Sequence, residues 1–236
     1  MKTSIIVAVV ILLSACAVSQ EKATIQREEQ TVPTQNRPSQ EQIERRISEM
    51  FRTDFAGLRR YREANNLIQP PVTGENRVVF MGNSITELWE TVDSTFFTRN
   101  RSFINRGIGG QTTPQMLIRF RNDVINLRPS VVVILAGTND IAGNTGPSRL
   151  EDIYGNIVSM AELAMANNVK VVLCSVLPVN DYPWRPGLEP ADKILNLNTM
   201  LSEYAGRHGL IYVDYHTPMA DERNGLKKEF SEDGVH

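Results

Sequence analysis

The sequence VVFMGNSIT, residues 78–86, joins a short apolar run to the first turn of an amphipathic one. Its first four residues are apolar and mostly β-branched or aromatic, a pattern typical of a strand buried on both faces of a parallel sheet. Ile85, Leu88 and Trp89 then recur at helical spacing, so Ser84 is expected where a strand turns into a helix. A hydroxyl at that edge, beside helix N–H groups, suits a nucleophile, yet a serine there commonly only caps the helix. Both interpretations stay open for this stretch alone.

The composition indicates one globular domain with helices and strands. Hydrophobic residues make up 41% of the 236 residues and charged residues 22%, which suits a single sizeable α/β core. The net charge is −2, and the basic residues are scattered in pairs such as Arg45-Arg46 and Arg59-Arg60. Such pairs are typical of solvated helix faces, which argues against a nucleic-acid partner.

The N-terminal residues predict export. Lys2 precedes an apolar run, residues 5–13, that is too short to span a bilayer and is typical of a secretory signal. The sequence LSAC ending at Cys16 resembles the bacterial lipobox, in which the cysteine is lipidated and becomes the mature N-terminus. The alternative is an ordinary signal peptide with Cys16 incidental. We expect residues 1–15 to be a lipoprotein signal peptide, and the chain to be an exported lipoprotein of the cell envelope.

Two segments connect this signal to the predicted domain. Residues 16–38 are rich in Gln, Glu and Thr without an apolar period, which predicts a disordered tether. In the lead-in, residues 39–76, Ser39 and Gln42 have the spacing of a capping box, and apolar residues recur at helical intervals to about Asn65. We expect one amphipathic helix packed against the domain; a coiled-coil or partner-binding role is the alternative.

Strand and helix patterns alternate five times after this lead-in. Two of the helices have N-terminal signals, Thr113 followed by Pro114, and Ser148 with Glu151. The alternation predicts an α/β fold, a three-layer α/β/α sandwich on a five-stranded parallel, flavodoxin-like sheet. The expected strands are residues 78–81, 102–105, 131–135, 169–176 and 210–213. Segments that follow the carboxyl ends of such strands meet at one edge of the sheet.

A glycine-rich loop follows the second predicted strand. The run GIGGQT, residues 107–112, allows the backbone to turn tightly and to aim N–H groups into a cleft. A dinucleotide-binding loop is the competing interpretation, but GxGG lacks the GxGxxG spacing and no suitable acidic residue follows. We therefore expect no cofactor.

A long segment without a regular period, residues 177–190, follows the fourth predicted strand and contains Tyr182 and Trp184. Loops of this length in compact domains commonly cover or line a site. The equally good alternative is an aromatic plug that shields the end of the sheet. Cys174, just before this loop, lies in an apolar run and is expected to be a small buried hydrophobe.

Four sequence blocks resemble, in order, those of the SGNH (GDSL-type) hydrolases. The resemblance is nearest to the branch that includes platelet-activating-factor acetylhydrolase catalytic subunits and bacterial acetylesterases, and it covers residues 77–236, the predicted hydrolase domain. Each block alone is weak, but four in sequence are highly specific. The blocks are GNSIT with Ser84, NRGIGGQTT with Gly110, GTND with Asn139, and DGVH with Asp233 and His236.

The resemblance implies a role for each of these residues. Ser84 would be the nucleophile, His236 its general base, and Asp233 the group that fixes the imidazole tautomer. The oxyanion would be held by the backbone N–H groups of Ser84 and Gly110 and by the side-chain amide of Asn139. Apart from the resemblance, we expect Asn83, beside the serine, and Tyr182 and Trp184, in the long loop, to line the substrate.

The chemistry of the residues agrees with these roles, because a serine hydroxyl needs a hydrogen-bonded base and the base needs an orienting group. The chain has three histidines. His208 falls at a predicted helix end, whereas His216 follows the fifth strand and is a fairer rival. The DxxH spacing of Asp233 and His236 favours His236. Asn139 has an alternative role as a loop-stabilising Asx residue.

Two departures from the family pattern stand out. Asn83 occupies the position before the serine where the family usually has Asp, which removes a charge beside the nucleophile. Relatives also continue beyond the position of His236 into a closing helix, so we expect the sequence to be truncated at its C-terminus.

The sequence therefore predicts a serine esterase that acts on short-chain esters, acetyl by resemblance, on carbohydrates, through an acyl-enzyme. A lysophospholipase-type lipid esterase is the first alternative. A non-catalytic envelope lipoprotein that binds glycans or a partner is the second. No His, Cys, Asp and Glu cluster has metal-ligand spacing, so no metal is expected. The expected partners are an ester substrate and, through the N-terminal lipid, a membrane.

Overall fold

The computed structural model of the chain describes residues 40–236, with only the backbone for residues 40–44, 46 and 47. The predicted signal peptide, Cys16 and the tether lie outside the described residues, as does Ser39 of the predicted capping box. The unit formed by residues 43–236 holds the fold described below.

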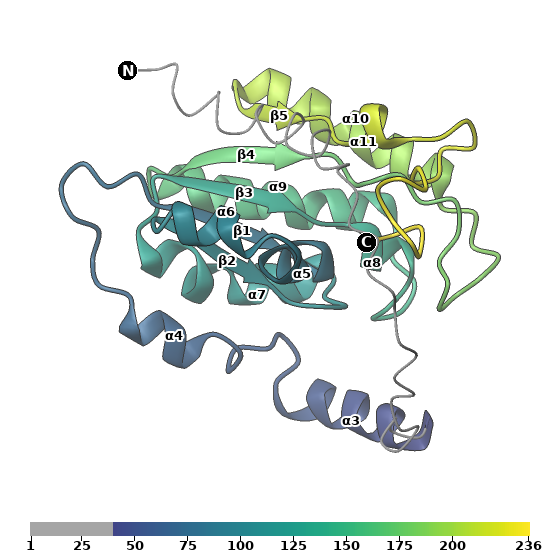
Figure 1. The fold of residues 1–236 in the computed structure, drawn as a ribbon, viewed down its shortest axis with the longest axis horizontal. Helices are drawn as coiled ribbons and strands as arrows, with labels where there is room; N and C mark the ends of the chain where they lie inside the picture. The colour runs from purple at the N-terminus through teal and green to yellow at the C-terminus, as the bar shows by residue number, and fades with distance from the viewer. Residues whose placement is uncertain (1–39) are drawn as a thin grey trace, which may run out of the picture. The chain divides into compact units, whose positions relative to one another are not determined.

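The centre of this unit is a sheet of five parallel strands (Figure 1). The order β2-β1-β3-β4-β5 confirms the predicted flavodoxin-like α/β architecture. Continuous apolar stretches such as VVVIL in β3 form central strands because helices cover both faces of the sheet. The strands are β1 (Val78–Gly82), β2 (Phe103–Gly107), β3 (Val131–Leu135), β4 (Lys170–Cys174) and β5 (Ile211–Val213).

Helices pack on both faces of the sheet. On one face α7 (Thr113–Asp123), α9 (Leu150–Ala166) and α10 (Ala191–His208) bury residues such as Met81 and Ile134. On the other face lie α5 (Ser84–Val92) and α6 (Ser94–Arg99) (Figure 1). They cover Phe80 with an aromatic cluster that includes Trp89 and Phe97. Alternate strand residues point to opposite faces, so each helical layer receives one set.

The single helix predicted to extend to about Asn65 is instead two helices. α3 (Gln40–Thr53) and α4 (Arg62–Leu67) are separated by a turn. The Asp54 carboxylate accepts hydrogen bonds from the N–H groups of Leu58 and Arg59 at 2.8 and 2.9 Å. Gly57 has φ +67°, which ends any helical path there. The prediction of one continuous helix was wrong because local hydrogen bonds to an Asp side chain compete with helix.

Two predicted helix starts also differ from the structure. The N-cap of α7 is Thr112 and not the predicted Thr113, so α7 begins one residue earlier than predicted. The Thr112 N–H donates to the Gln115 side chain at 2.9 Å. The Ser148–Glu151 capping box is not formed: Arg149 is the N-cap of α9 and makes no capping hydrogen bond with its side chain. The remaining short elements are η1 (Ile125–Leu127), α8 (Thr138–Ile141) and α11 (His216–Met219).

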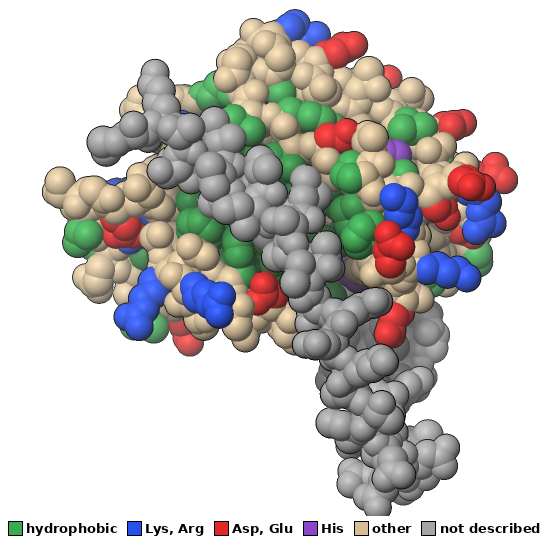
Figure 2. All heavy atoms as spheres, turned by 45° about the horizontal axis from the view of Figure 1, so that its top comes forward, with side chains coloured by type: hydrophobic (Ala, Val, Ile, Leu, Met, Phe, Trp, Pro, Cys, Tyr) green, Lys and Arg blue, Asp and Glu red, His purple; other side chains and the backbone are tan. Residues whose placement is uncertain are grey.

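Charged side chains of both signs lie interspersed on the face shown in Figure 2. Within residues 40–236, no helix is long and apolar enough to cross a bilayer. Cys174 at the end of β4 is a free thiol, 2% exposed, as predicted.

Candidate active site

Ser84 lies at the point where β1 ends and α5 begins. The turn is tight, since a Cβ added to Gly82 would lie 2.0 Å from Thr86 Oγ1. Asn83 is the N-cap of α5, and its side-chain oxygen accepts the Ile85 N–H at 3.0 Å. Asn83 is 1% exposed, so it has no surface with which to line a substrate, and that prediction was wrong. Its amide performs the capping task that was the alternative role for Ser84, which leaves the serine hydroxyl free.

The hydroxyl of Ser84 meets the imidazole of His236, 152 residues later in the chain. Ser84 Oγ lies 2.8 Å from His236 Nε2, and His236 Nδ1 lies 2.7 Å from Asp233 Oδ2. An ionised carboxylate can only accept, so Nδ1 carries the proton and Nε2 is left to accept the Ser84 hydroxyl proton. This is the order of hydroxyl, base and orienting carboxylate that nucleophilic catalysis by serine requires.

Asp233 is held by the turn in which it lies. Its Oδ1 accepts the N–H groups of Val235 and His236 at 2.9 and 2.8 Å and the Ser231 hydroxyl at 3.0 Å. Burial by itself would raise the pKa of Asp233, but the hydrogen bonds from His236, Val235 and Ser231 outweigh it and hold the pKa well below its usual range. The carboxylate is therefore ionised at neutral pH.

Backbone N–H groups from two segments lie beside Ser84. The glycine loop runs against the serine: a Cβ on Gly109 would be 3.8 Å from Ser84 Cβ. Gly110 has φ +74°, a conformation that favours glycine. Within residues 40–236 its N–H has no acceptor, and neither does that of Ser84 in the first turn of α5.

Asn139 joins this group from the turn after β3. The residue is 3% exposed, and Nδ2 donates to the Gln111 carbonyl at 3.0 Å. That bond uses one of the two amide hydrogens and leaves the second available. Ser84, Gly110 and Asn139, which follow three neighbouring strands, are thus tied together at the carboxyl edge of the sheet.

One buried carboxylate in this region was not singled out from the sequence. Asp140 accepts the Thr113 N–H on both oxygens at 2.9 and 3.0 Å and the Thr113 hydroxyl at 2.6 Å. Burial raises its pKa to about 6. Asp140 links the turn carrying Asn139 to the start of α7, and its position directly after Asn139 in GTND was the signal available.

Comparison with known proteins gives the family. The GDSL-like lipase/acylhydrolase family matches residues 80–236, more than half of the chain. The chain belongs to this family. The sequence of this GDSL-type chain is 49% identical to that of a GDSL-like lipase from Bacteroides thetaiotaomicron. The match covers 78% of this chain and 90% of that one, and the two structures superpose with a TM-score of 0.76. A candidate acylhydrolase from Bacteroides fragilis is 47% identical over 78% and 89%, with the same TM-score.

Two curated relatives of this GDSL-type chain match over shorter stretches. "Uncharacterized lipoprotein YqeF" of Bacillus subtilis is 33% identical over 94 residues, 39% of each protein. Human platelet-activating factor acetylhydrolase IB subunit alpha2 is 30% identical over 118 residues, 46% of this chain and 47% of that protein. The chain thus spans less than half the length of the curated relatives it matches. The family is the GDSL-type one that the sequence blocks resembled, and its description names lipases and acylhydrolases.

The two aromatic residues of the loop in this GDSL-type chain have different positions. Tyr182 is fully buried, and its hydroxyl donates to the Thr138 carbonyl at 2.9 Å. Tyr182 therefore acts as the aromatic plug that was the alternative interpretation of this loop, and the prediction that it lines the substrate was wrong. Trp184 is 46% exposed, its ring centroid lies 6.5 Å from that of His236, and its Nε1 donates to Asn144 Oδ1 at 3.2 Å. An exposed indole beside the imidazole remains as the aromatic surface of the site.

The other histidines of the GDSL-type domain lie elsewhere. His208 ends α10, where its Nδ1 is 2.9 Å from the Tyr204 carbonyl and its ring stacks on Tyr204. His216 is buried at the start of α11, burial lowers its pKa, and its Nε2 finds no partner among the described residues. Neither forms a hydrogen bond with Ser84 in the described chain.

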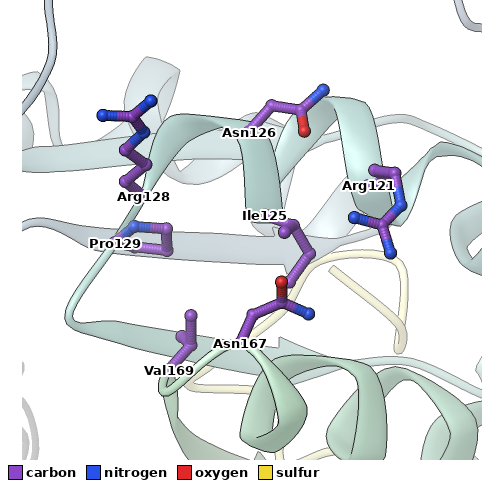
Figure 3. Close-up of a pocket in the computed structure, with 7 residues that line it drawn as sticks. All are labelled: Arg121, Ile125, Asn126, Arg128, Pro129, Asn167 and Val169. Atoms are coloured by element: carbon purple, nitrogen blue, oxygen red, sulfur yellow. The ribbon is translucent and has the colours of Figure 1, made fainter.

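No three His, Cys, Asp or Glu side chains within residues 40–236 are grouped so as to hold a metal ion. A hollow of about 650 Å³ is lined by Arg121, Pro129, Asn167 and Val169 among others (Figure 3). Pro129 lies two residues before β3 and Val169 one residue before β4, so this hollow lies at the amino edge of the GDSL-type sheet, opposite Ser84. Its size does not make it the active site, because none of the groups suited to ester hydrolysis line it.

Proposed function

We propose that the chain is a serine esterase that works through an acyl-enzyme. The observation that carries the proposal is the alignment of Ser84 Oγ, His236 and the ionised Asp233 at 2.8 and 2.7 Å. A non-catalytic binding protein has no need for a serine hydroxyl held against an imidazole that a carboxylate orients. The three groups would act as nucleophile, general base and orienting carboxylate.

Each step of the hydrolysis follows from this arrangement. His236 Nε2 takes the proton of Ser84 Oγ as the oxygen attacks the acyl carbon, and the carbonyl electrons move to the oxygen. The N–H groups of Ser84 and Gly110 and the Asn139 amide donate to that oxyanion; one such donor is worth on the order of 3 kcal/mol of barrier. His236 then protonates the departing alcohol. His236 then takes a proton from water, which attacks the acyl carbon. The bond from that carbon to Ser84 Oγ breaks, His236 returns the proton to Oγ, and the acid leaves.

The proposed substrate is a short acyl ester, acetyl in the first instance, on a carbohydrate. The name of the platelet-activating factor acetylhydrolase relative supports an acetyl group. Trp184 supports a carbohydrate, because a half-exposed indole face beside His236 offers a flat apolar surface on which a sugar ring can stack. A lysophospholipid is the alternative, and the family description, which includes lipases, keeps it open.

The proposed location is the cell envelope, with Cys16 lipidated and the enzyme attached to a membrane by its N-terminus. The LSAC sequence and the similarity to a Bacillus subtilis lipoprotein support this location. Residues 16–38 would act as the flexible tether between lipid and enzyme.

Hydrolysis of p-nitrophenyl acetate by the full chain tests the activity. Ser84→Ala should lower kcat at least about 10³-fold, because it removes the nucleophile and leaves only binding and the oxyanion donors. Ser202→Ala, on the exposed surface of α10, is the matched control and should keep the wild-type rate. Equal rates for wild type and Ser84→Ala would rule out the serine esterase and favour the binding protein.

The substrate is tested by comparing kcat/KM across esters. The proposal predicts a steep fall from p-nitrophenyl acetate to the octanoate and release of acetate from an acetylated oligosaccharide. Efficient cleavage of long-chain esters and of lysophosphatidylcholine would instead support the lipid esterase. The ratio of kcat/KM for the acetate to kcat/KM for the octanoate measures how much more tightly the enzyme binds the transition state of the short ester.

A further inference from the structure

Residues 54–67, here called the strap, precede the part of the chain that matches the family, residues 80–236. The strap consists of the Asp54 turn and α4. Asp54 closes the turn through the N–H groups of Leu58 and Arg59, so the turn holds its own shape and leaves the carbonyls of Phe55 and Ala56 to accept bonds from outside.

The first set of contacts joins the strap to the glycine loop, residues 107–111. The Gln111 side chain donates to the Ala56 carbonyl at 2.8 Å, and the Tyr61 hydroxyl donates to the Gly107 carbonyl. A Cβ on Gly57 would lie 3.1 Å from the Gln111 side-chain nitrogen, so the Gly57 backbone packs closely against that side chain. Both ends of the loop that carries Gly110 are thus bonded to the strap.

A second contact reaches the middle of the same loop through α5. Arg60 Nη2 lies 3.1 Å from Glu87 Oε1, and the other carboxylate oxygen of Glu87 accepts the Gly109 N–H at 2.7 Å. The peptide that presents the Gly110 N–H is the one between Gly109 and Gly110. Its position is therefore fixed on one side by a carboxylate that the strap orients.

The third contact joins α4 of the strap to β2 and α7. The Asn65 oxygen accepts two bonds from the Arg106 guanidinium at 2.9 and 2.7 Å, and its amide donates to Asp123 at 2.7 Å. Asp123 in turn pairs with the buried Arg119, whose Nε donates to the Gln111 side chain at 2.6 Å. The strap and the loop share one hydrogen-bonded network, and such a network holds its members in a single arrangement.

We propose that the strap is a positioning element for the oxyanion-binding loop, so that the catalytic rate depends on a segment outside the family's matched region. The inference rests on the proposed function, because Gly110 matters only if an oxyanion forms beside Ser84. The N–H of Gly110 must sit within hydrogen-bond distance of the oxyanion, and a displacement of about 1 Å is enough to lower a rate by about 10²-fold. In the described chain the strap makes no hydrogen bond to Ser84 or His236; it reaches the site through the glycine loop and through Glu87 of α5.

The double variant Tyr61→Phe/Arg60→Met tests this role in the full chain. It removes the hydroxyl bond to Gly107 and the cation on Glu87 while keeping the Tyr61 ring, which packs against the Arg106 guanidinium. We expect kcat on p-nitrophenyl acetate to fall about tenfold with KM within about twofold, because substrate binding does not use the loop N–H. The Ki of a short alkyl boronic acid, whose serine adduct mimics the tetrahedral intermediate, should rise with the fall in kcat.

The matched control is Tyr154→Phe/Arg149→Met. It makes the same chemical changes at Arg149, the N-cap of α9, and at Tyr154 within α9. In the described chain the side chains of these two residues form hydrogen bonds only with the exposed Asp152 and Arg207. The control should keep the wild-type kcat and boronic acid Ki, and both double variants should keep Tm within a few degrees of wild type. A strap variant with the kcat and Ki of the control overturns the proposal.

Two further results keep the test decisive. If the double variant also loses stability, Arg60→Met alone decides, since Arg60 is largely exposed: a fall in kcat of about threefold at unchanged Tm supports the strap, and no fall overturns it. Equal rates for wild type and Ser84→Ala would remove the proposed function and the strap's role together. Full activity of the strap variant beside an inactive Ser84→Ala removes only the strap's role.

Discussion

Two aspartates beside the glycine loop and the serine show how surroundings decide the charge of a carboxyl group. Asp233 is partly exposed and accepts three hydrogen bonds within its own turn besides that of the His236 ring, which keeps its pKa low. Asp140 is buried, and its bonds from Thr113 only partly offset the loss of hydration, so its pKa rises to about 6. The first is suited to holding an imidazole in one tautomer. The second is ionised at neutral pH only at the expense of stability.

Asp140→Asn is expected to stabilise the protein in alkaline solution. The folded pKa of about 6 lies above the ordinary 3.8, so the fold favours the protonated carboxyl. Its contribution to the free energy of unfolding is fully present below pH 3.8 and is lost as the pH rises through about 6. Asparagine stays neutral, so the variant should be more stable than wild type by about 3 kcal/mol at pH 8, and the difference should vanish near pH 4. Urea unfolding at both pH values measures it.

Asp152→Asn is the control, because Asp152 is exposed in an ion pair with Arg149. It should leave the free energy of unfolding nearly unchanged at either pH, because an exposed ion pair contributes little to stability. If Asp140→Asn were less stable than wild type at pH 8, the bonds from Thr113 would have to outweigh the cost of burying the charge.

The sequence indicated which residues meet, because Ser84, Gly110 and Asn139 each follow a strand end and parallel strands share one carboxyl edge. The structure brings these three and His236 together, and their catalytic roles stay predictions. The loop of residues 177–190 has no period, so nothing in the sequence separated the buried Tyr182 from the exposed Trp184. Asp140 was missed although it directly follows Asn139, because its partner Thr113 lies 27 residues earlier and no sequence spacing connects the two.

At the scale of elements, the position of Ser84 depends on how closely α5 approaches β2. A Cβ on Gly107 would lie 2.2 Å from the Glu87 backbone nitrogen and 2.7 Å from Glu87 Cα. Backbone atoms of a helix cannot move aside as a side chain can. α5 packs directly against the backbone of β2 at Gly107. This contact therefore also sets the position of Ser84, in the first turn of α5.

Gly107→Ala is therefore expected to destabilise the protein by about 2–4 kcal/mol and to lower kcat, because α5 must shift to admit the methyl group. Gly155→Ala in α9 is the matched control: nothing lies within 4 Å of the added Cβ. In a helix interior this change should stabilise by up to about 1 kcal/mol. Chemical denaturation measures both, and equal stabilities for the two variants would contradict the close approach.

The sequence located the elements better than their ends. The apolar strands were found because burial on both faces leaves a continuous apolar run, as in VVVIL. The helix expected to extend to about Asn65 was divided by Asp54 and Gly57, an Asp and a Gly three residues apart that mark a turn when they are weighed against the helical period. That turn presents the carbonyls that the glycine loop binds, so its misassignment also concealed the strap.

For the whole molecule, the two edges of the sheet have different characters. The carboxyl edge gathers Ser84, Gly110, Asn139 and His236, whereas the amino edge holds the hollow lined by Arg121 and Asn167. The chemistry of an edge, and not the volume of its hollow, identifies the site in this fold.

The proposed membrane attachment makes a prediction about the whole protein. Expressed in a bacterium from the full sequence, the wild-type chain should incorporate labelled palmitate and partition into detergent, and Cys16→Ser should do neither. Cys174→Ser is the control and should behave as wild type, because Cys174 is buried in β4. A wild-type chain without label would point to an ordinary signal peptide.

Cys174 has a consequence of its own. Only a thiolate reacts with iodoacetamide, and burial raises the pKa of this thiol to about 12. The chain has two cysteines, so in the Cys16→Ser protein Cys174 is the sole thiol. Alkylation then proceeds only in molecules whose sheet has momentarily come apart at β4. The rate at which Cys174 is alkylated therefore reports how often the sheet opens locally at β4, in ordinary buffer and without any denaturant.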